Sequence, residues 1–86
     1  MSENFNPHLR AAILEVVDNQ ITNDNPPETR QTYERLLREG ISAYDAKSLI
    51  GSVVAVEIFE VLKRQEPFNP QRFVQALNRL PELPEE

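Results

Sequence analysis

A single carboxylate within an apolar segment is the side chain of this sequence best placed for chemistry. Residues 53–62 read VVAVEIFEVL and place Glu57 among aliphatic and aromatic neighbours. A buried, unpaired carboxylate is costly, so Glu57 should be paired, protonated or exposed at a rim. One interpretation makes Glu57 a general base or an oxygen ligand with a raised pKa. We favour the other, a structural charge pair, because catalysis needs further groups that the sequence lacks.

The partner of Glu57 must come from another helix. No basic residue lies three or four positions away from it, so it has no partner on its own helix. Arg30, Arg72, Tyr33 and His8 are the candidates on neighbouring helices. Arg30 is favoured because it flanks the apolar stripe of its helix. The sequence therefore predicts a buried charge pair between Glu57 and Arg30.

Residue types that usually carry catalysis are scarce. The chain has no Cys, one His (His8) and two Gly, which excludes thiolate metal sites, a Cys–His pair and a Gly-rich phosphate loop. We therefore expect no enzyme, with no catalytic residue, no cofactor and no metal site. An enzyme with an all-carboxylate metal site is the alternative, and stabilisation by Mg²⁺ or Mn²⁺ would be its first sign.

Chain length and net charge exclude further classes of function. With 86 residues the chain has room for one domain, 1–86. Nine basic against 14 acidic residues give a net charge of −5, a surface that repels nucleic acid and anionic lipid. The longest uncharged apolar segment, 48–56, is too short to span a bilayer, and the start has no signal-peptide pattern. We expect a cytoplasmic protein with no nucleic acid or membrane partner.

Turn and capping residues divide the chain into four helices. Asn6-Pro7 and Asn69-Pro70 combine an N-cap with proline at the first helical position, Ser42 is a third N-cap, and Gly40 is a helix stop. Apolar residues recur at helical spacing in between, and no segment is typical of a strand. The fold class is all-α, a compact four-helix domain with a frayed tail at 81–86 and helices at about 7–20, 27–39, 43–65 and 70–80.

The third predicted helix is long and apolar on most sides, so we expect it to be central and surrounded. It also carries a strip of mostly small residues, which lets another backbone approach closely. That strip is a candidate helix-packing or interface surface, formed by Ser48, Gly51, Ser52, Ala55 and Phe59. Either the other helices cover the third helix, or part of it contacts a second copy in a homodimer.

The stretch LLREGISAYDAKSLIG also fits a helix-turn-helix, a motif of DNA-binding regulators. The first turns of its second helix carry Asp45 and one lysine, Lys47, which is not the basic stripe that DNA requires. A nucleic-acid-binding regulator with an atypical acidic surface is therefore the alternative to the main prediction.

The segments NPPETRQTYERLLREGIS, AVEIFEVLK and PFNPQRFVQALNRLPELP together resemble small helical bacterial proteins of an uncharacterised family. The resemblance implies a bacterial origin and no assigned activity, and it transfers no functional residue. The main prediction is a non-catalytic protein–protein interaction module, whose partner is another protein or a second copy of the chain.

Overall fold

Four helices make up the fold of the computed structural model, which describes residues 7–84. The predicted all-α, four-helix architecture is confirmed, and no strand occurs within the described range. The structure's elements are α1 (Pro7–Asn23), α2 (Pro27–Arg38), α3 (Ala43–Arg64) and α4 (Pro70–Arg79).

Local capping chemistry fixes where the helices begin. Ser42 Oγ accepts a hydrogen bond from the Asp45 N–H at 3.1 Å, and Asn69 Oδ1 accepts one from the Arg72 N–H at 3.1 Å. Both contacts satisfy a backbone donor that a first helical turn leaves unpaired. Helices α1, α2 and α4 each begin at a proline, as the sequence predicts. The expected N-cap Asn6 lies outside the described residues.

The helix ends also follow local rules, with one difference from the prediction. Gly40 has a φ of +93° directly after the α2 C-cap residue, and left-handed residues end α1 at Asp24 and α3 at Gln65. Helix α1 continues to Asn23 instead of stopping near residue 20. Its last turn is retained because Ile21 packs on the core, and Thr and Asn disfavour a helix only weakly.

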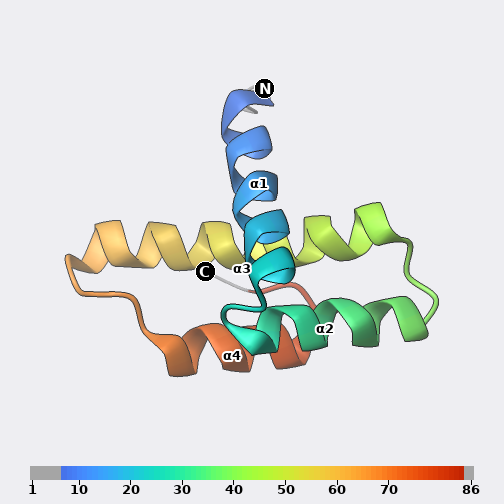
Figure 1. Cartoon of the computed structure of the whole chain (residues 1–86). Helices are drawn as coiled ribbons and strands as arrows, with labels where there is room; N and C mark the ends of the chain where they lie inside the picture. The colour runs from blue at the N-terminus through green and yellow to red at the C-terminus, as the bar shows by residue number, and fades with distance from the viewer. Residues whose placement is uncertain (1–6, 85–86) are drawn as a thin grey trace.

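The helices form two layers that α1 crosses. Helix α3 spans one layer, with α2 beneath its N-terminal half and α4 beneath its C-terminal half (Figure 1). Helix α1 stands across the middle of α3, and its first turns extend beyond the rest of the molecule (Figure 1). Within the described residues α1 packs against α2 and α3 but not against α4. The C-terminal half of α3 therefore lacks a neighbour on one side.

The core lies where all four helices converge. Its buried apolar residues are Val17, Leu36, Ala46, Ile50, Val53, Val54, Phe73, Leu77 and Leu80.

Polar contacts join the helices at the edge of this core. Arg35 of α2 donates to the Leu77 and Leu80 carbonyls at 3.0 and 2.9 Å, which satisfies the end of α4. Lys47 of α3 pairs with Asp18 of α1 at 2.8 Å.

The prediction of an apolar third helix surrounded on most sides is not confirmed. Helix α3 does contact each of the other three helices. Its C-terminal half, however, leaves Ile58, Phe59 and Leu62 exposed by 47, 49 and 71%. The reason is the path of α1, which crosses α3 near Gly51 and leaves these side chains beyond its edge.

The chain continues from α4 into a turn. The Glu82 N–H donates to the Arg79 carbonyl at 2.9 Å in a turn. Leu83 then lines a shallow hollow with Ile41 and Leu49, although it stays 55% exposed. The frayed tail expected at 81–86 stays a prediction, and residues 85 and 86 lie outside the described range.

No helix among the described residues is long and apolar enough to span a membrane.

Candidate functional site

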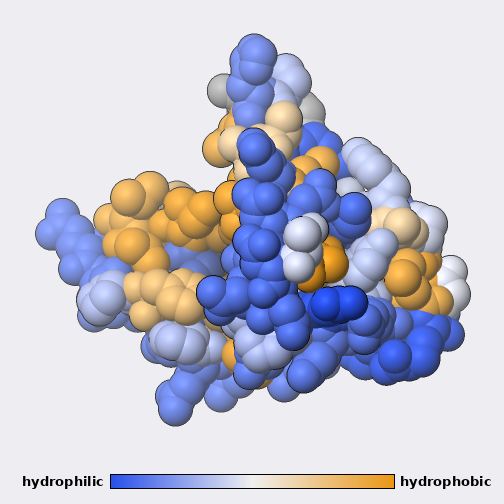
Figure 2. Space-filling view, viewed as in Figure 1, coloured by the Kyte–Doolittle hydropathy of each residue, from blue (hydrophilic) through white to orange (hydrophobic). Residues whose placement is uncertain are grey.

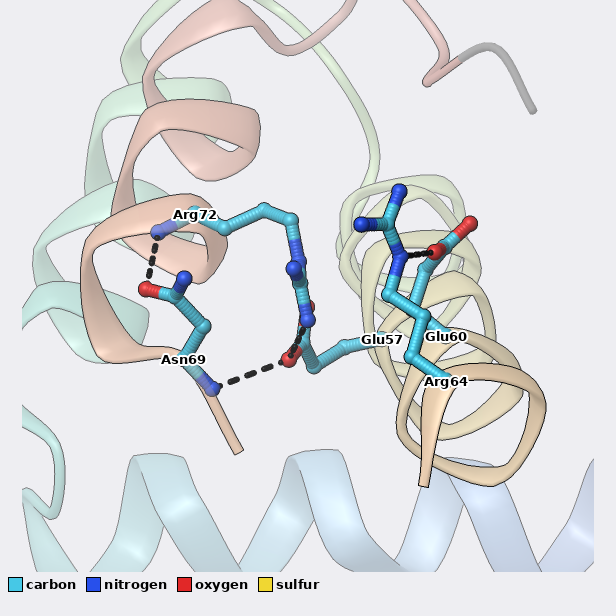
Figure 3. Close-up of polar contacts among 5 residues, drawn as sticks. All are labelled: Glu57, Glu60, Arg64, Asn69 and Arg72. Carbon is cyan, nitrogen blue, oxygen red and sulfur yellow. Dashed lines mark hydrogen bonds and ion pairs between the residues drawn. The ribbon is translucent and has the colours of Figure 1, made fainter. Parts of the chain in front are cut away.

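Glu57 sits at the junction of α3, the following loop and α4, where three donors hold its carboxylate (Figure 3). Arg72 binds both oxygens, through Nε to Oε1 at 2.8 Å and through Nη2 to Oε2 at 2.8 Å. The Asn69 backbone N–H donates to Oε2 at 3.1 Å. Glu57 is 5% exposed. The carboxylate thus anchors the N-terminus of α4, whose partial positive charge also favours an anion there.

These hydrogen bonds determine the charge state of Glu57. The Arg72 guanidinium, followed by the Asn69 N–H, holds the pKa of Glu57 below its ordinary value, although burial acts in the opposite direction. The same contact raises the pKa of Arg72. Glu57 is therefore ionised at neutral pH and is a weak base. The arrangement fits a structural ion pair, and it does not provide the raised pKa that a general base requires.

The predicted partner Arg30 is wrong. Arg30 pairs with Glu34, four residues along α2, at 3.3 Å, and both side chains are about half exposed. Arg72 pairs with Glu57 because α4 folds back along α3 and brings its first turn to Glu57. Sequence reasoning retained Arg72 as a candidate but gave it no preference. A buried acid preceding a helix with a strong N-cap signal was the available clue, because helix N-termini attract anions.

The small-residue strip of α3 is partly used for helix packing. A Cβ built on Gly51 would lie 3.3 Å from Ile13 Cγ2 and 3.7 Å from Leu14 Cδ2, so α1 approaches closely there. Arg10 of α1 donates to Ser48 Oγ at 3.1 Å and to the Tyr44 hydroxyl. The remaining members, Ser52, Ala55 and Phe59, are partly buried or exposed. Whether they contact a second copy stays a prediction.

An apolar groove of about 290 Å³ lies on α3 between α1 and the start of α4. It exists because α1 and α4 both pack on α3 without packing on each other. We call it the groove, and its lining residues are Val16, Gln20, Val54, Glu57, Ile58, Val61, Leu62, Phe68 and Phe73.

Exposed apolar side chains continue from the groove onto the outer surface of α3. Phe59 follows the groove residue Ile58 and is one turn from Leu62; we call these three residues the ridge. Across the groove, Val16 is 38% and Phe68 51% exposed. Figure 2 shows hydrophobic surface over the C-terminal half of α3 and beside α1. Groove and ridge form one apolar surface with Glu57 in its wall, a feature that sequence reasoning missed.

The charged groups of the described residues bear on metal binding and on the predicted helix-turn-helix. No group of three or more His, Asp or Glu lies close enough to hold a metal ion in the range 7–84. In the predicted helix-turn-helix, Lys47 is engaged by Asp18, and the exposed start of α3 carries Asp45. The helix-turn-helix alternative stays a prediction.

Comparison with protein families identifies the chain by its sequence. The family model described as "Domain of unknown function (DUF1841)" matches residues 1–79. Comparisons with curated proteins and with solved structures give no match. The chain belongs to this family of unknown function, which confirms the predicted relationship to an uncharacterised family.

Proposed function

We propose that this chain, as a member of that family, is a non-catalytic interaction module that binds a protein through the groove and the ridge. The observation that carries the proposal is the exposure of five large apolar side chains on one face, Val16, Ile58, Phe59, Leu62 and Phe68. Scattered exposed apolar residues are ordinary on a protein surface, but a contiguous set around a groove is typical of a contact site.

The state of Glu57 supports a binding role over catalysis. Its side chain lines the groove, yet both carboxylate oxygens accept hydrogen bonds from Arg72 and Asn69. A general base must accept a proton from a substrate, and this carboxylate has a lowered pKa and occupied oxygens. Glu57 therefore supports the proposal as a residue that shapes the groove by fixing α4 against α3.

The size and chemistry of the surface favour a protein over other partners. Apart from Glu57, the groove is lined by uncharged side chains, which suits the apolar centre of a protein interface. A nucleic acid would need basic groups to neutralise its phosphates, and the chain has a net charge of −5. We expect duplex DNA to produce no salt-dependent shift in fluorescence anisotropy, and a shift that weakens with salt would favour the regulator alternative.

A photo-crosslinking experiment tests the proposal directly. A photoreactive amino acid replaces Leu62 in the full chain, in cells that produce the protein, and adducts are identified by mass spectrometry. Leu83 is the matched control because it is also a largely exposed leucine, at 55%, but lies outside the groove and the ridge. We expect an identified protein to crosslink from position 62 and not from position 83.

A second substitution then tests whether the adduct depends on this surface. Ile58→Glu places a charge beside position 62 at a residue that is 47% exposed, so the fold should tolerate it. The adduct from position 62 should then disappear. Equal crosslinking from positions 62 and 83, or an adduct that survives Ile58→Glu, would overturn the proposed binding surface.

A further inference from the structure

We infer that the occupant of the groove and the ridge is a second copy of this chain, with α1 of each copy lying against the α3 ridge of the other. The inference rests on the proposed function, because it uses the same surface and names its partner. Three features carry it: the projection of α1, the placement of apolar residues on both α1 and α3, and the area that they expose.

Helix α1 can serve both as one wall of the groove and as the element that enters a partner's groove. It stands across α3, and its first turns extend past the other helices (Figure 1). Val16 lines the groove from α1, and Ala12, one turn earlier on the same helix face, is exposed. Ala12 and Val16 thus form a short apolar stripe on α1, alongside the part of the helix whose Arg10 contacts Ser48 of α3.

A two-fold axis satisfies both surfaces at once. In such a dimer both copies use the same patch. If residue i of the first copy contacts residue j of the second, then residue i of the second copy also contacts residue j of the first. The α1 stripe of the first copy lies on the ridge of the second copy, and the α1 stripe of the second copy lies on the ridge of the first. The ridge side chains Phe59 and Leu62 gain an apolar neighbour that their own α1 does not provide, because it crosses α3 nearer to Gly51.

The exposed apolar area matches what a dimer of ordinary size requires. The exposed fractions of Val16, Ile58, Phe59, Leu62 and Phe68 run from 38 to 71%. An aromatic side chain buries about 150–250 Å² and an aliphatic one less, so the five together offer at most roughly 400–600 Å² per copy. A standard interface buries about 800 Å² per partner, of which about 56–65% is apolar. The exposed apolar area is thus comparable with the apolar part of such an interface, about 450–520 Å² per partner.

Chain length and charge are consistent with this occupant. A domain of this size buries a modest share of its surface and gains from covering more of it. Two copies that each carry a net charge of −5 repel one another, but none of the five exposed side chains is charged. Because salt screens the repulsion and leaves the apolar contact in place, self-association should strengthen as salt rises.

The first test is the molar mass of the full chain by sedimentation equilibrium from about 5 to 500 μM, a range that brackets typical micromolar dimers. We expect the mass to rise from 9.9 kDa toward twice that value. Leu62→Glu should weaken dimerisation at least about tenfold, as expected for a residue near the centre of an interface. The matched control Leu83→Glu should stay within about twofold of the wild type. Circular dichroism and thermal melting would show that both variants fold.

The second test asks which helices meet. The natural chain contains no cysteine, so Ala12→Cys and Leu62→Cys each supply the only thiol of their copy. One of the two carries a tag, so that a mixed disulfide has its own mass. Oxidation of the mixture should give the mixed product readily, whereas Ala12→Cys with Leu83→Cys should give little.

Each outcome separates this inference from the proposed function. A mass of 9.9 kDa at every concentration overturns the second copy, and the proposed function then stands if another protein crosslinks from position 62. A monomer without any adduct at position 62 overturns both. A dimer that is indifferent to Leu62→Glu, or that crosslinks Ala12→Cys equally to Leu83→Cys, overturns the arrangement of α1 on α3.

Discussion

Replacing Glu57 by Gln removes the charge at the junction of α3 and α4 and keeps the shape of the side chain. The substituted side chain would retain one acceptor oxygen, but its NH₂ group would replace the other and face one of the two Arg72 donors that now bind Oε1 and Oε2 at 2.8 Å. Hydrogen bonds to charged groups contribute about 1.5–3 kcal/mol, and stranding one partner of a buried pair costs about 3–5 kcal/mol. The Arg72 side chain is 32% exposed, so water can solvate part of its unpaired charge. We therefore expect Glu57→Gln to lower the free energy of unfolding by about 2 kcal/mol.

Urea unfolding followed by circular dichroism measures this loss. For a small domain the free energy of unfolding falls by about 1 kcal/mol per M of urea, so the urea midpoint should fall by about 2 M at pH 7. Glu34→Gln is the matched control, since it breaks a pair with Arg30 in which the two side chains are 52 and 51% exposed. Its midpoint should move by less than about 0.5 M.

The pH dependence provides an independent check of the same contact. Because Arg72 lowers the pKa of Glu57 in the folded state, the ion pair stabilises the fold above the unfolded pKa of about 4.3. This stability is lost as the pH falls through the folded pKa, because protonated Glu57 resembles Gln. The difference between wild type and Glu57→Gln should be constant from about pH 7 to pH 5 and shrink below about pH 4. An unchanged midpoint at pH 7, or a difference that persists undiminished at low pH, would refute the ion-pair reasoning.

Three further predictions follow from the packing. Gly51→Leu should destabilise the fold by about 1–3 kcal/mol because α1 must move away. Gly51→Ala should be near neutral, since its better helix propensity offsets the 3.3 Å approach to Ile13. Equal effects of the two substitutions in urea unfolding would contradict the close approach. Leu36→Ala, at a fully buried core position, should lower the free energy of unfolding by about 2–5 kcal/mol. Leu37→Ala should cost far less, because Leu37 is 39% exposed. Comparable melting temperatures of the two variants would argue against this orientation of α2. Asn69→Ala should cost about 0.5–2 kcal/mol through loss of the α4 cap, and a melting temperature identical to wild type would show that this cap contributes nothing.

The sequence determined the helices because their boundaries depend on residues close together in the chain. The Ser42 cap reaches a backbone donor three residues away, and Gly40 acts through its own φ angle. Proline at the first position of a helix likewise needs no distant contact. For this reason the predicted starts of the helices agree with the structure, as does the all-α class.

The sequence also singled out Glu57 as a carboxylate on an apolar helix face that should be paired, protonated or exposed at a rim. Its neighbours at helical spacing are apolar, and an unpaired buried charge is too costly to persist. The preference for Arg30 failed because a helical pattern specifies which side of a helix a residue occupies, but not which other helix faces it. Arg72 lies 15 residues further along the chain and reaches Glu57 only after the chain has turned back at the loop between α3 and α4.

Only the tertiary structure decided which apolar side chains of α3 are covered. The sequence makes Val53, Ile58 and Leu62 equally plausible as core residues, yet the first is buried and the other two are exposed. The difference depends on the angle at which α1 crosses α3, and that angle results from packing around Gly51 rather than from any local preference. The groove and the ridge arise because α1 and α4 occupy separate parts of α3, an arrangement set by contacts between residues distant in the sequence.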